Sequence, residues 1–327
     1  MAYKNIIGIG NALVDILTQI PDDHILDELN LQKGAMQHVD AATSSMIGEH
    51  LKQYGSAMEA GGSTANTVSG AAKLGIQAGY IGKVGLDLLG KFFEEEMEKT
   101  HVHPLMQTTE TPTGCAQAIV SQDGERTFAT YLGAALELEP SDLKPEMFDG
   151  WDILFLEGYL VFNRPLVDRA LEIAHEKDMT VAIDMASFNV VEANRDYLQD
   201  IIAKYIDIVF ANQEESRALT GQDDPEAALH TIASWCDIAV VKVGAKGSYV
   251  QQGNKVVRIE PIPAEVVDTT GAGDLWAAGF MAGLIMDKSI EQCARMGATL
   301  AANIIEVVGA KMDEKRWQKI TNSLELS

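Results

Sequence analysis

Basic residues are scarce in this sequence. Its 327 residues include 25 Lys and Arg against 48 Asp and Glu, which gives a formal net charge of −23 at pH 7, and Lys or Arg runs do not occur. Such an acidic surface repels phosphate backbones and anionic lipid headgroups. We therefore expect no nucleic-acid partner and no membrane partner.

Cysteine is also scarce, and long apolar runs are missing. Cys115, Cys236 and Cys293 are odd in number and widely spaced. They predict no disulfide framework and fit a reducing compartment. No stretch reaches the ~18 apolar residues that a membrane-spanning helix needs, and the short apolar start is wrongly flanked for a signal peptide. The expected location is the cytoplasm.

What the sequence does contain is an alternation of short β-branched runs with amphipathic helical patterns. The runs are nearly continuous in hydrophobicity, which is typical of strands covered on both faces. They are Ile6–Ile9, Ala78–Ile81, Ile153–Leu156, Thr180–Ile183, Ile206–Phe210 and Ile238–Val243. Between them, Pro165–Lys177 has one apolar face and a proline near its start, as helices do. This alternation predicts an α/β fold with a central, mostly parallel sheet flanked by helices.

Two segments break the alternation, at about residues 13–39 and 113–132. In the second, Gln117–Val120 and Thr127–Tyr131 flank an Asp-Gly turn, which is typical of a β-hairpin. Hairpin strands inserted into a parallel α/β pattern suggest a small β lid over a site. Because the sequence has no internal repeat and no Pro/Gly-rich linker, we expect residues 1–327 to form one domain with this lid.

The strongest motif is Asp268–Asp274, which reads Asp-Thr-Thr-Gly-Ala-Gly-Asp and opens an apolar helical run. The backbone N–H groups of Gly271, Ala272 and Gly273, in a tight turn at a helix N-terminus, would form an anion hole for a transferring phosphoryl group. We expect the helix terminus to keep Asp274 ionised and Asp274 to act as the base on a substrate hydroxyl. The alternative is a capping Asp without a catalytic role.

A second motif follows the run at Ile206–Phe210. Asn212 and Glu215 would share one face of the first turn of the next helix. Side-chain oxygens at the end of a strand suit Mg²⁺, held through water. A capping box explains the same spacing without any metal.

Two further groups of residues suit a polyhydroxylated ligand. Gly61 and Gly62 permit close approach of a ligand at the start of a helix, and Asn66 offers both a donor and an acceptor to a hydroxyl. Asn11 and Asp15, just after the first run, pair an amide with a carboxylate and suit a vicinal diol.

Other patterns with known chemistry are incomplete. Gly85–Lys91 fits the opening of a P-loop, but Phe92 stands where that loop needs Ser or Thr. Gly8 and Gly10 begin a dinucleotide fingerprint, but Leu13 occupies the third glycine position. We therefore expect neither kind of nucleotide site.

The motifs, in this order, resemble the ribokinase-like (PfkB) family of carbohydrate and nucleoside kinases. Asp268–Asp274 is similar to the family's C-terminal signature, Gly61–Gly75 and Val84–Gly90 are similar to its N-terminal signature, and Asn212–Glu215 is similar to its Asn-x-x-Glu motif. The resemblance covers about residues 6–308. It implies an ATP-dependent kinase with a β lid and with ATP bound over the glycine-rich turn.

Within the family, the sequence most resembles the adenosine kinase branch. Gly10–Asp15 and Gly61–Asn66 are similar to that branch's ribose-binding segments. The resemblance implies that Asp15 holds the ribose diol, and that Asn66 and the Gly61-Gly62 backbone complete the pocket.

The resemblance also assigns a lid residue and an aromatic pair. Gly124–Thr127 resembles the lid segment whose Arg reaches the transferring phosphate, so Arg126 is the expected positive clamp. Tyr159 and Phe162 are expected either to stack on a base or to lie in the core.

The cofactors implied by the resemblance are ATP and Mg²⁺. The expected nucleotide contacts are Asn212, Lys242, Gly244, Gly247, Thr270, Gly271, Gly273 and Asn303. Mg²⁺ would lie near Asn212 and Glu215. Several family members bind a monovalent cation near the anion-hole loop, and for K⁺ here Asp268 and Thr270 lie in the right stretch.

The sequence departs from the family pattern in two places. Leu275-Trp276 stands where the signature usually has Ala-Phe, which is a tolerable change on the buried side of the helix. Asp184–Ser187 differs from the usual sequences near the substrate pocket, which leaves the identity of the base open. The leading hypothesis is a kinase for the 5′-hydroxymethyl group of an adenosine-like nucleoside. The alternatives are a sugar kinase of the ribokinase or fructokinase type and a non-catalytic ligand sensor. The sequence leaves monomer and homodimer equally open.

Overall fold

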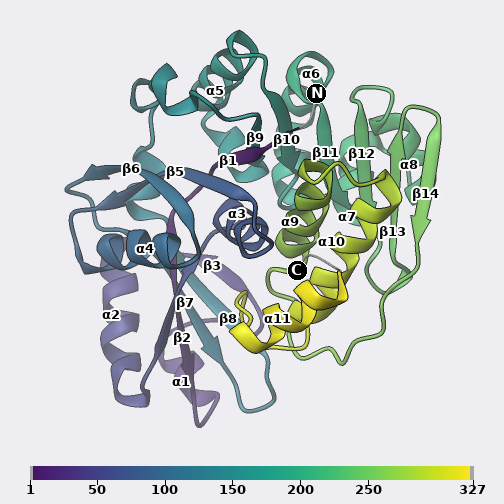
Figure 1. Ribbon diagram of the computed structural model, residues 1–327. Helices are drawn as coiled ribbons and strands as arrows, with labels where there is room; N and C mark the ends of the chain where they lie inside the picture. The colour runs from purple at the N-terminus through teal and green to yellow at the C-terminus, as the bar shows by residue number, and fades with distance from the viewer. Residues whose placement is uncertain (1–2, 325–327) are drawn as a thin grey trace.

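Two β-sheets organise the chain, as Figure 1 shows for a computed structural model that describes residues 3–324. Residues 1–2 and 325–327, which the predicted 1–327 domain includes, lie outside the described residues. The larger sheet has nine strands within this range. In spatial order they are β14 (Lys255–Ile259), β13 (Ser248–Gln252), β12 (Ile238–Lys242), β11 (Ile208–Asn212), β10 (Thr180–Asp184), β9 (Ile153–Glu157), β1 (Asn5–Ile9), β5 (Gln77–Gly85) and β6 (Val102–Thr109).

The large sheet is parallel from β12 through to β6, and only β13 and β14 run antiparallel at one edge. The six strand-like runs in the sequence correspond to β1, β5, β9, β10, β11 and β12. The prediction of a mostly parallel sheet is therefore confirmed. Strands β6, β13 and β14 were not predicted from the sequence, because their residues are largely half-buried or exposed and form no continuous apolar run.

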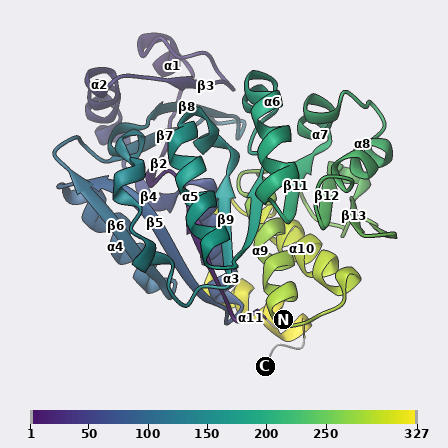
Figure 2. The ribbon, with the colours of Figure 1, turned by 90° about the horizontal axis from the view of Figure 1, so that it is seen from above.

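Helices cover both faces of the large sheet, as the view from above shows (Figure 2). One face packs on α3 (Ser63–Lys73), α4 (Leu88–Lys99), α9 (Ala272–Ile285), α10 (Ile290–Ile304) and α11 (Glu314–Ser323), and the other on α5 (Arg164–Glu176), α6 (Phe188–Tyr205), α7 (Gln213–Thr220) and α8 (Pro225–Ile232). The helix predicted at Pro165–Lys177 is α5, with Asn163 as its N-cap. Within residues 3–324, no helix combines the length and the apolar character needed to cross a membrane.

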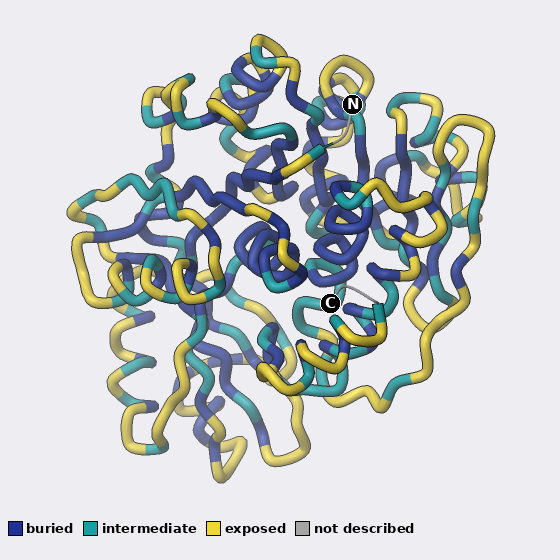
Figure 3. The backbone as a smooth tube through the Cα atoms, viewed as in Figure 1, coloured by how far each residue is buried: buried dark blue, intermediate teal, exposed yellow. Residues whose placement is uncertain are grey.

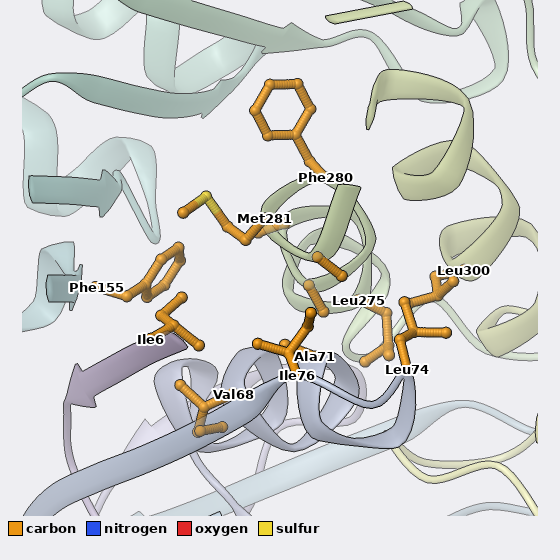
Figure 4. Packing of buried hydrophobic residues seen from close by; sticks show 14 of the residues in the cluster. Ile6, Val68, Ala71, Leu74, Ile76, Phe155, Leu275, Phe280, Met281 and Leu300 are labelled. Carbon is orange, nitrogen blue, oxygen red and sulfur yellow. The ribbon is translucent and has the colours of Figure 1, made fainter. Parts of the chain in front are cut away.

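The strands of the large sheet contribute side chains to two separate hydrophobic cores, because successive side chains of a strand point to opposite faces of the sheet. In β9, Phe155 packs toward α3 and α9, whereas Leu154 and Leu156 pack toward α5 and α6. Figure 4 shows Phe155 beside Met281 of α9 and near Val68 of α3. Burying each such side chain contributes about 1.5–3 kcal/mol to folding. The strands and the central helices accordingly form the buried interior of Figure 3.

Helices α3 and α9 lie against each other at the centre of the molecule (Figure 1). A Cβ atom on Gly70 of α3 would lie 2.7 Å from Cβ of Ala278, so only glycine allows this close approach. The contact continues to the start of both helices, where Thr67 Oγ1 donates a hydrogen bond to the backbone oxygen of Asp274. The packing thus brings two sequence motifs more than 200 positions apart to one place.

A second, smaller sheet contains the two segments that interrupt the alternation in the sequence. Its strands, in spatial order, are β3 (Met36–His38), β8 (Arg126–Tyr131), β7 (Gly114–Val120), β2 (Leu13–Gln19) and β4 (Ala57–Gly61). The antiparallel β7–β8 hairpin matches the one predicted in residues 113–132. The hairpin also expected in residues 13–39 is wrong, because β2 pairs with β4 and β7 whereas β3 pairs with β8. Strand β4 was missed, because Ala-Met-Glu-Ala-Gly has no β-branched or aromatic residue.

The outer face of the second sheet carries its own small core. Helices α1 (His24–Glu28) and α2 (Ala41–Leu51) cover it with apolar side chains such as Ile47, which packs with Ile119 of β7. Short 3-10 helices complete the chain at Lys52–Tyr54, Gly133–Glu137, Pro140–Asp142, Pro145–Phe148, Gly158–Phe162 and Gly244–Lys246.

The segment that resembles a P-loop has a structural role. Asp87 is the N-cap of α4, and its side chain accepts hydrogen bonds from the Gly90 N–H and from the backbone and hydroxyl of Thr113. These bonds join α4 to the start of β7. The segment is a helix cap and, in agreement with the sequence analysis, no part of a phosphate-binding loop.

Candidate active site

A cavity of about 1180 Å³ opens at the carboxyl edge of the large sheet, between that sheet and the second one. Its wall includes Glu157, Asp184, Asn212 and Lys242, the last residues of β9, β10, β11 and β12. Ligands of open α/β sheets bind at this edge. The second sheet closes the other side with residues such as Asp15 of β2.

The glycine-rich turn lies in the wall of the cavity and begins α9. Gly271 is the N-cap residue with φ +73°, and a Cβ atom there would lie 2.9 Å from Cβ of Ala310, so the turn requires glycine. The N–H of Ala272 donates to the oxygen of Thr269, which leaves the next N–H groups of the first helical turn to face a ligand. The predicted anion hole therefore centres on Gly273 rather than on Ala272.

Asp274 lies in the first turn of α9 and is held by two side chains of α3. Ser63 Oγ donates to its Oδ1 at 2.7 Å, and Asn66 Nδ2 donates to its Oδ2 at 2.9 Å. Burial raises the pKa of Asp274, while the bonds from Asn66 and Ser63 lower it. Burial thus opposes ionisation while the two donors favour it, and the expectation that the helix terminus keeps Asp274 ionised stays a prediction.

Asn66 was predicted to contact a substrate hydroxyl. Its Nδ2 is used by Asp274, whereas its Oδ1 is buried without a hydrogen-bond partner and lies in the cavity wall. A buried acceptor without a donor is costly, so a ligand hydroxyl that donates to Oδ1 stabilises the complex. The contact of Asn66 with a substrate hydroxyl stays a prediction, and its Oδ1 is available for it while Nδ2 bonds to Asp274.

Asp15 lines the opposite end of the cavity, on β2. A Cβ atom at Gly61 of the neighbouring β4 would lie 2.5 Å from Oδ2 of Asp15, so Gly61 acts by making room for this carboxylate. Burial raises the pKa of Asp15 to about 7; nearby Lys311 lowers it and Glu59 raises it further. Near neutral pH this carboxyl group changes its charge readily.

Asn11 has a partner that the sequence analysis did not assign. Its backbone N–H and its Nδ2 both donate to Oε1 of Glu157, at 3.0 and 2.6 Å, and the N–H of Thr64 donates to Oε2. Gly62, with φ +100°, permits the chain to pass against the backbone oxygen of Asn11. Glu157 therefore ties β1, β9 and the start of α3 into one wall of the cavity.

Arg126 of β8 lies behind the glycine-rich turn. Its Nη2 is 2.9 Å from Oδ2 of Asp268, and its Nη1 donates to Oγ1 of Thr270 at 3.4 Å. Among the described residues that line the cavity, Thr270 is present but Arg126 and Asp268 are not. The predicted clamp therefore joins the second sheet to the turn, and its contact with phosphate stays a prediction.

Lys242, at the end of β12, reaches the turn from the other side. Its Nζ lies 2.8 Å from Oδ2 of Asp184 and 3.3 Å from where a Cβ atom of Gly273 would be. Burial lowers the pKa of Lys242, but the carboxylates of Asp184 and Glu215 outweigh that effect and leave it raised. The ammonium group is thus charged in the cavity.

These features coincide with a known family. Residues 33–316 match the model of the pfkB family carbohydrate kinases. The chain belongs to this family. It is an ATP-dependent kinase that acts on a sugar or a nucleoside, and it has the ribokinase-like fold.

Relatives of this pfkB kinase differ in the acceptor that their names state. The crystal structure of adenosine kinase from Sinorhizobium meliloti is 33% identical, with a TM-score of 0.87 and with 99% of this chain and 100% of that chain covered. The 5-dehydro-2-deoxygluconokinase of Bacillus subtilis is 30% identical over 75% of this chain and 80% of its own. Ribokinase of Haemophilus influenzae is 27% identical over 85% of this chain and 91% of its own.

The predicted magnesium motif of this pfkB kinase forms a capping box at the start of α7. The Asn212 side chain accepts from the Glu215 N–H, and both carboxylate oxygens of Glu215 accept hydrogen bonds from Asn212. Within residues 3–324, no group of three or more His, Cys, Asp or Glu side chains is arranged to hold a metal ion directly. The oxygens therefore fit Mg²⁺ held through water better than direct coordination.

Neighbouring charges also shift the pKa of Glu215. Burial and the nearby carboxylate of Asp184 raise the pKa of Glu215 to about 7, and Lys242 opposes this shift. A divalent cation would offset the same repulsion between Glu215 and Asp184. The site thus fits a cation bound at the ends of β10 and β11.

The residues predicted to bind a monovalent cation, Asp268 and Thr270, form bonds with other protein groups. The carboxylate of Asp268 pairs with Arg126 and also accepts from the Thr270 N–H and hydroxyl and from the Gly309 N–H. A carboxylate with this many donors has little capacity left for an ion. Asp268 and Thr270 therefore do not fit a K⁺ site in this arrangement.

Exposed apolar side chains also line the cavity. Tyr159 and Phe162, in the 3-10 helix Gly158–Phe162, are 37% and 68% exposed and line the cavity. The choice between core and ligand contact that the sequence left open is thereby decided against the core. Leu136 and Met36 add two further exposed apolar side chains to the same wall.

The residues predicted for the nucleotide divide into two groups. Gly244 and Gly247 lie in the cavity wall, and both have positive φ, +57° and +90°. Asn303 of α10 donates to the oxygen of Thr299 in its own helix, and it is not among the described residues that line the cavity. The structure therefore gives no support to a nucleotide contact from Asn303.

The sequence analysis missed two functional side chains at the centre of this site. Ser63 follows Gly61-Gly62 directly, and the sequence pattern assigned it no role, because its partner Asp274 lies 211 positions away. Glu157 directly follows the predicted run Ile153–Leu156, and the end of a parallel strand is where polar side chains meet a ligand. A search of every strand end for polar residues would have found it.

Proposed function

We propose that this kinase transfers the γ-phosphoryl group of ATP to the 5′-hydroxymethyl group of a nucleoside with an adenosine-like base. Kinase chemistry follows from membership of the pfkB family. The proposal concerns the acceptor.

The observation that carries the proposal is a set of exposed apolar side chains in the wall of the cavity. Tyr159, Phe162, Leu136 and Met36 expose large apolar surfaces there, between 37% and 68%. A flat base covers such surfaces and stacks on the aromatic rings. A free sugar has hydroxyls on every side and would leave this wall in contact with polar groups.

Polar groups next to this wall suit the ribose. Asp15 has no hydrogen-bond donor among the described residues, so its carboxylate is free to accept two hydroxyls of a vicinal diol. Asn66 Oδ1 is a free acceptor between Asp15 and the base Asp274. A ribose between the two ends would direct its 5′-hydroxyl toward Asp274.

The transfer step then needs few groups from the protein. The 5′-oxygen attacks the γ-phosphorus and forms the new O–P bond, while the bond from the γ-phosphorus to the β,γ-bridging oxygen breaks and its electron pair leaves with ADP. Asp274 Oδ takes the proton of the hydroxyl. The N–H groups at the start of α9 stabilise the negative charge of the phosphoryl oxygens.

Residues around the other end of the cavity suit ATP. Gly244 and Gly247 give the base and sugar of ATP close access to backbone, and Asn212 and Glu215 hold the water shell of Mg²⁺. Bound Mg²⁺ neutralises charge on the phosphates. Arg126 is proposed to hold the second sheet close to the turn through its pair with Asp268.

The test is ATP consumption by the purified protein across a panel of nucleosides and free sugars with Mg²⁺. We expect turnover with adenosine or a related nucleoside. The Asp274→Asn variant should lose about 10³-fold in kcat, because general base catalysis contributes roughly 10²–10⁴-fold. Turnover with free sugars alone would overturn the acceptor proposal and leave the kinase chemistry intact.

A sugar acceptor is the second candidate. Several relatives are named as sugar kinases, among them the 5-dehydro-2-deoxygluconokinase and ribokinase given above. Asp15, Asn66 and Asn11 would serve a furanose or an open-chain sugar equally well. The same panel separates the two candidates, because a sugar kinase would show no preference for a base.

A further inference from the structure

The oxygens beside the glycine-rich turn already have protein partners. Oδ1 of Asp268 accepts hydrogen bonds from the Thr270 N–H at 3.0 Å and from the Thr270 hydroxyl at 2.8 Å. Its Oδ2 accepts from the Gly309 N–H at 2.7 Å and lies 2.9 Å from Nη2 of Arg126. The backbone oxygen of Ile305 accepts from two N–H groups, one of them that of Asp268. A further ligand would have to displace one of these contacts.

This arrangement does not fit the monovalent cation that the family resemblance implies near the turn. A K⁺ ion gives up its hydration shell only where several protein oxygens replace it. Each carboxylate oxygen of Asp268 has two partners, and an added ion would also lie close to the positive charge of Arg126. Like charges at such a distance repel each other strongly where water is excluded. The disagreement raises the question of what balances the charge of Asp268.

The guanidinium group of Arg126 supplies that balance. The side chains of Arg126 and Asp268 are each only 9% exposed. A carboxylate buried to this extent is costly without a positive partner. A guanidinium keeps its charge at every physiological pH and, unlike a dissolved ion, does not depend on the salt in solution.

The same pair connects the second sheet to the anion hole. Arg126 is the first residue of β8, whereas Asp268 precedes Gly271, the N-cap residue of α9. The bonds of Asp268 to Thr270 and Gly309 fix the backbone that leads into the turn. Without its positive partner, the buried carboxylate would be stabilised by moving toward water, and these bonds would weaken. The direction of the N–H groups at the start of α9 therefore depends on the charge beside Asp268.

We propose that the guanidinium group of Arg126 takes the place of a monovalent cation as the counter-charge of Asp268, so that this kinase is active without K⁺. Arg126 is a positioning residue in this role: it acts on the anion hole through Asp268, and no bond of the transfer step forms or breaks at it. Because Arg126 belongs to the second sheet, the anion hole is complete only while that sheet lies against the turn. The inference goes beyond the proposed acceptor and holds for a nucleoside and for a sugar.

The first experiment needs no variant. Initial rates of the wild type with Mg²⁺ and the Tris salt of ATP are measured in the chlorides of tetramethylammonium, Na⁺ and K⁺, at one ionic strength of about 0.1 M. We expect kcat to agree within about twofold in the three salts, because an ion that does not bind shifts no equilibrium. Stimulation by K⁺ of more than about fivefold would overturn the proposal.

The second experiment removes the counter-charge. Arg126→Ala takes away the guanidinium group and leaves space beside Asp268. In tetramethylammonium its kcat should fall by roughly 10²-fold, and K⁺ should restore at least about tenfold of that loss by binding to the freed carboxylate. Arg126→Lys keeps a positive charge and should stay insensitive to K⁺. Arg295→Ala, which removes an exposed arginine of α10, is the matched control for net charge and should match the wild type.

Thermal unfolding provides a readout that does not depend on activity. Compared with tetramethylammonium, K⁺ should raise the Tm of Arg126→Ala by about 2 °C, because an ion that binds only the folded state stabilises it. The Tm of the wild type should be the same in both salts. A Tm of the wild type that rises as much as that of the variant would show that K⁺ binds beside Arg126, and would refute the proposal.

The proposal also fails if K⁺ restores neither the activity nor the Tm of Arg126→Ala, since Arg126 would then act only as a phosphate contact or as a link between the sheets. If Arg126→Ala does not fold in any of the salts, Arg126→Gln, which keeps more of the side chain without its charge, takes its place with the same expected response to K⁺. A wild type that phosphorylates no nucleoside refutes the proposed acceptor, but the thermal comparison still decides the role of Arg126.

Discussion

The two ends of the cavity are built from different parts of the molecule. The part proposed to receive ATP is formed by strand ends of the large sheet and by the start of α9, and its key residues fall into short sequence motifs. The part proposed to hold the acceptor is formed by β2, β3 and two 3-10 helices, whose residues are spread from Asp15 to Phe162. The motifs of the proposed ATP part can thus be recognised locally in the sequence, whereas the proposed acceptor part is assembled from segments without a common motif.

The carboxylates at the two ends also differ in whether they have hydrogen-bond donors in the protein. At the ATP end, Asp274 is held by Ser63 and Asn66, and Glu215 is held by Asn212. At the acceptor end, Asp15 is without a donor among the described residues, and its pKa is raised to about 7. The ATP end is preorganised before a ligand arrives, whereas the acceptor end keeps an uncommitted group for the ligand.

Removing the Ser63 hydroxyl would break the preorganisation at the ATP end. Ser63→Ala should lower kcat/KM by roughly tenfold to a hundredfold, since a hydrogen bond to a charged group contributes about 1.5–3 kcal/mol. Because the Ser63 bond lowers the pKa of Asp274, its loss should also move the acid limb of the kcat/KM profile to higher pH. The measurement is a pH–rate profile with saturating Mg-ATP.

Thr67→Val provides the matched control for Ser63→Ala. Thr67 Oγ1 donates to the backbone oxygen of Asp274 and to that of Ser63, and neither bond touches the carboxylate. The acid limb of Thr67→Val should therefore coincide with that of the wild type. An acid limb that stays in place in Ser63→Ala would show that Ser63 does not tune the base.

The same contrast explains which features the sequence could predict. The parallel strands, the hairpin and the glycine-rich turn follow from local patterns of hydrophobicity and glycine, which act within a few residues. The partnership of Ser63 with Asp274 spans 211 positions and arises from the packing of α3 on α9, which no local pattern encodes. The pKa of Asp274 likewise depends on burial by distant segments, an effect that the position at a helix terminus does not reveal.

Truncation of Phe162 tests whether the acceptor and ATP bind in separate parts of the cavity. Phe162→Ala should raise KM for a nucleoside acceptor by about tenfold and leave KM for ATP within about twofold, since stacking on a ring contributes about 0.5–1.5 kcal/mol beyond area burial. Initial rates with each substrate varied in turn measure both constants. Tyr205→Ala, an exposed aromatic at the end of α6, controls for loss of a surface ring. Equal increases of both KM values would contradict a division of the cavity into two ends.

The smallest expected effect is on the stability of the folded protein, which the buried carboxyl group of Asp15 lowers. The pKa of Asp15 is near 4 in the unfolded chain and about 7 in the folded protein, so ionisation favours unfolding increasingly as pH rises from 4 to 7 and by a constant amount above that.

Asp15→Asn should therefore raise Tm by about 3 °C at pH 8, where Glu59 still faces Lys311, and by much less at pH 4, where the folded carboxyl group is protonated and the unfolded one is about half protonated. Thermal unfolding at the two pH values tests this, with the exposed Glu98→Gln as the control. The same variant should weaken acceptor binding at pH 8, because an amide accepts one diol hydroxyl less well than a carboxylate accepts two. A variant that gained the same stability at both pH values would contradict this explanation. It would show that Asp15 lowers the folding stability because it is a buried polar group, and not because its ionisation is suppressed in the folded protein.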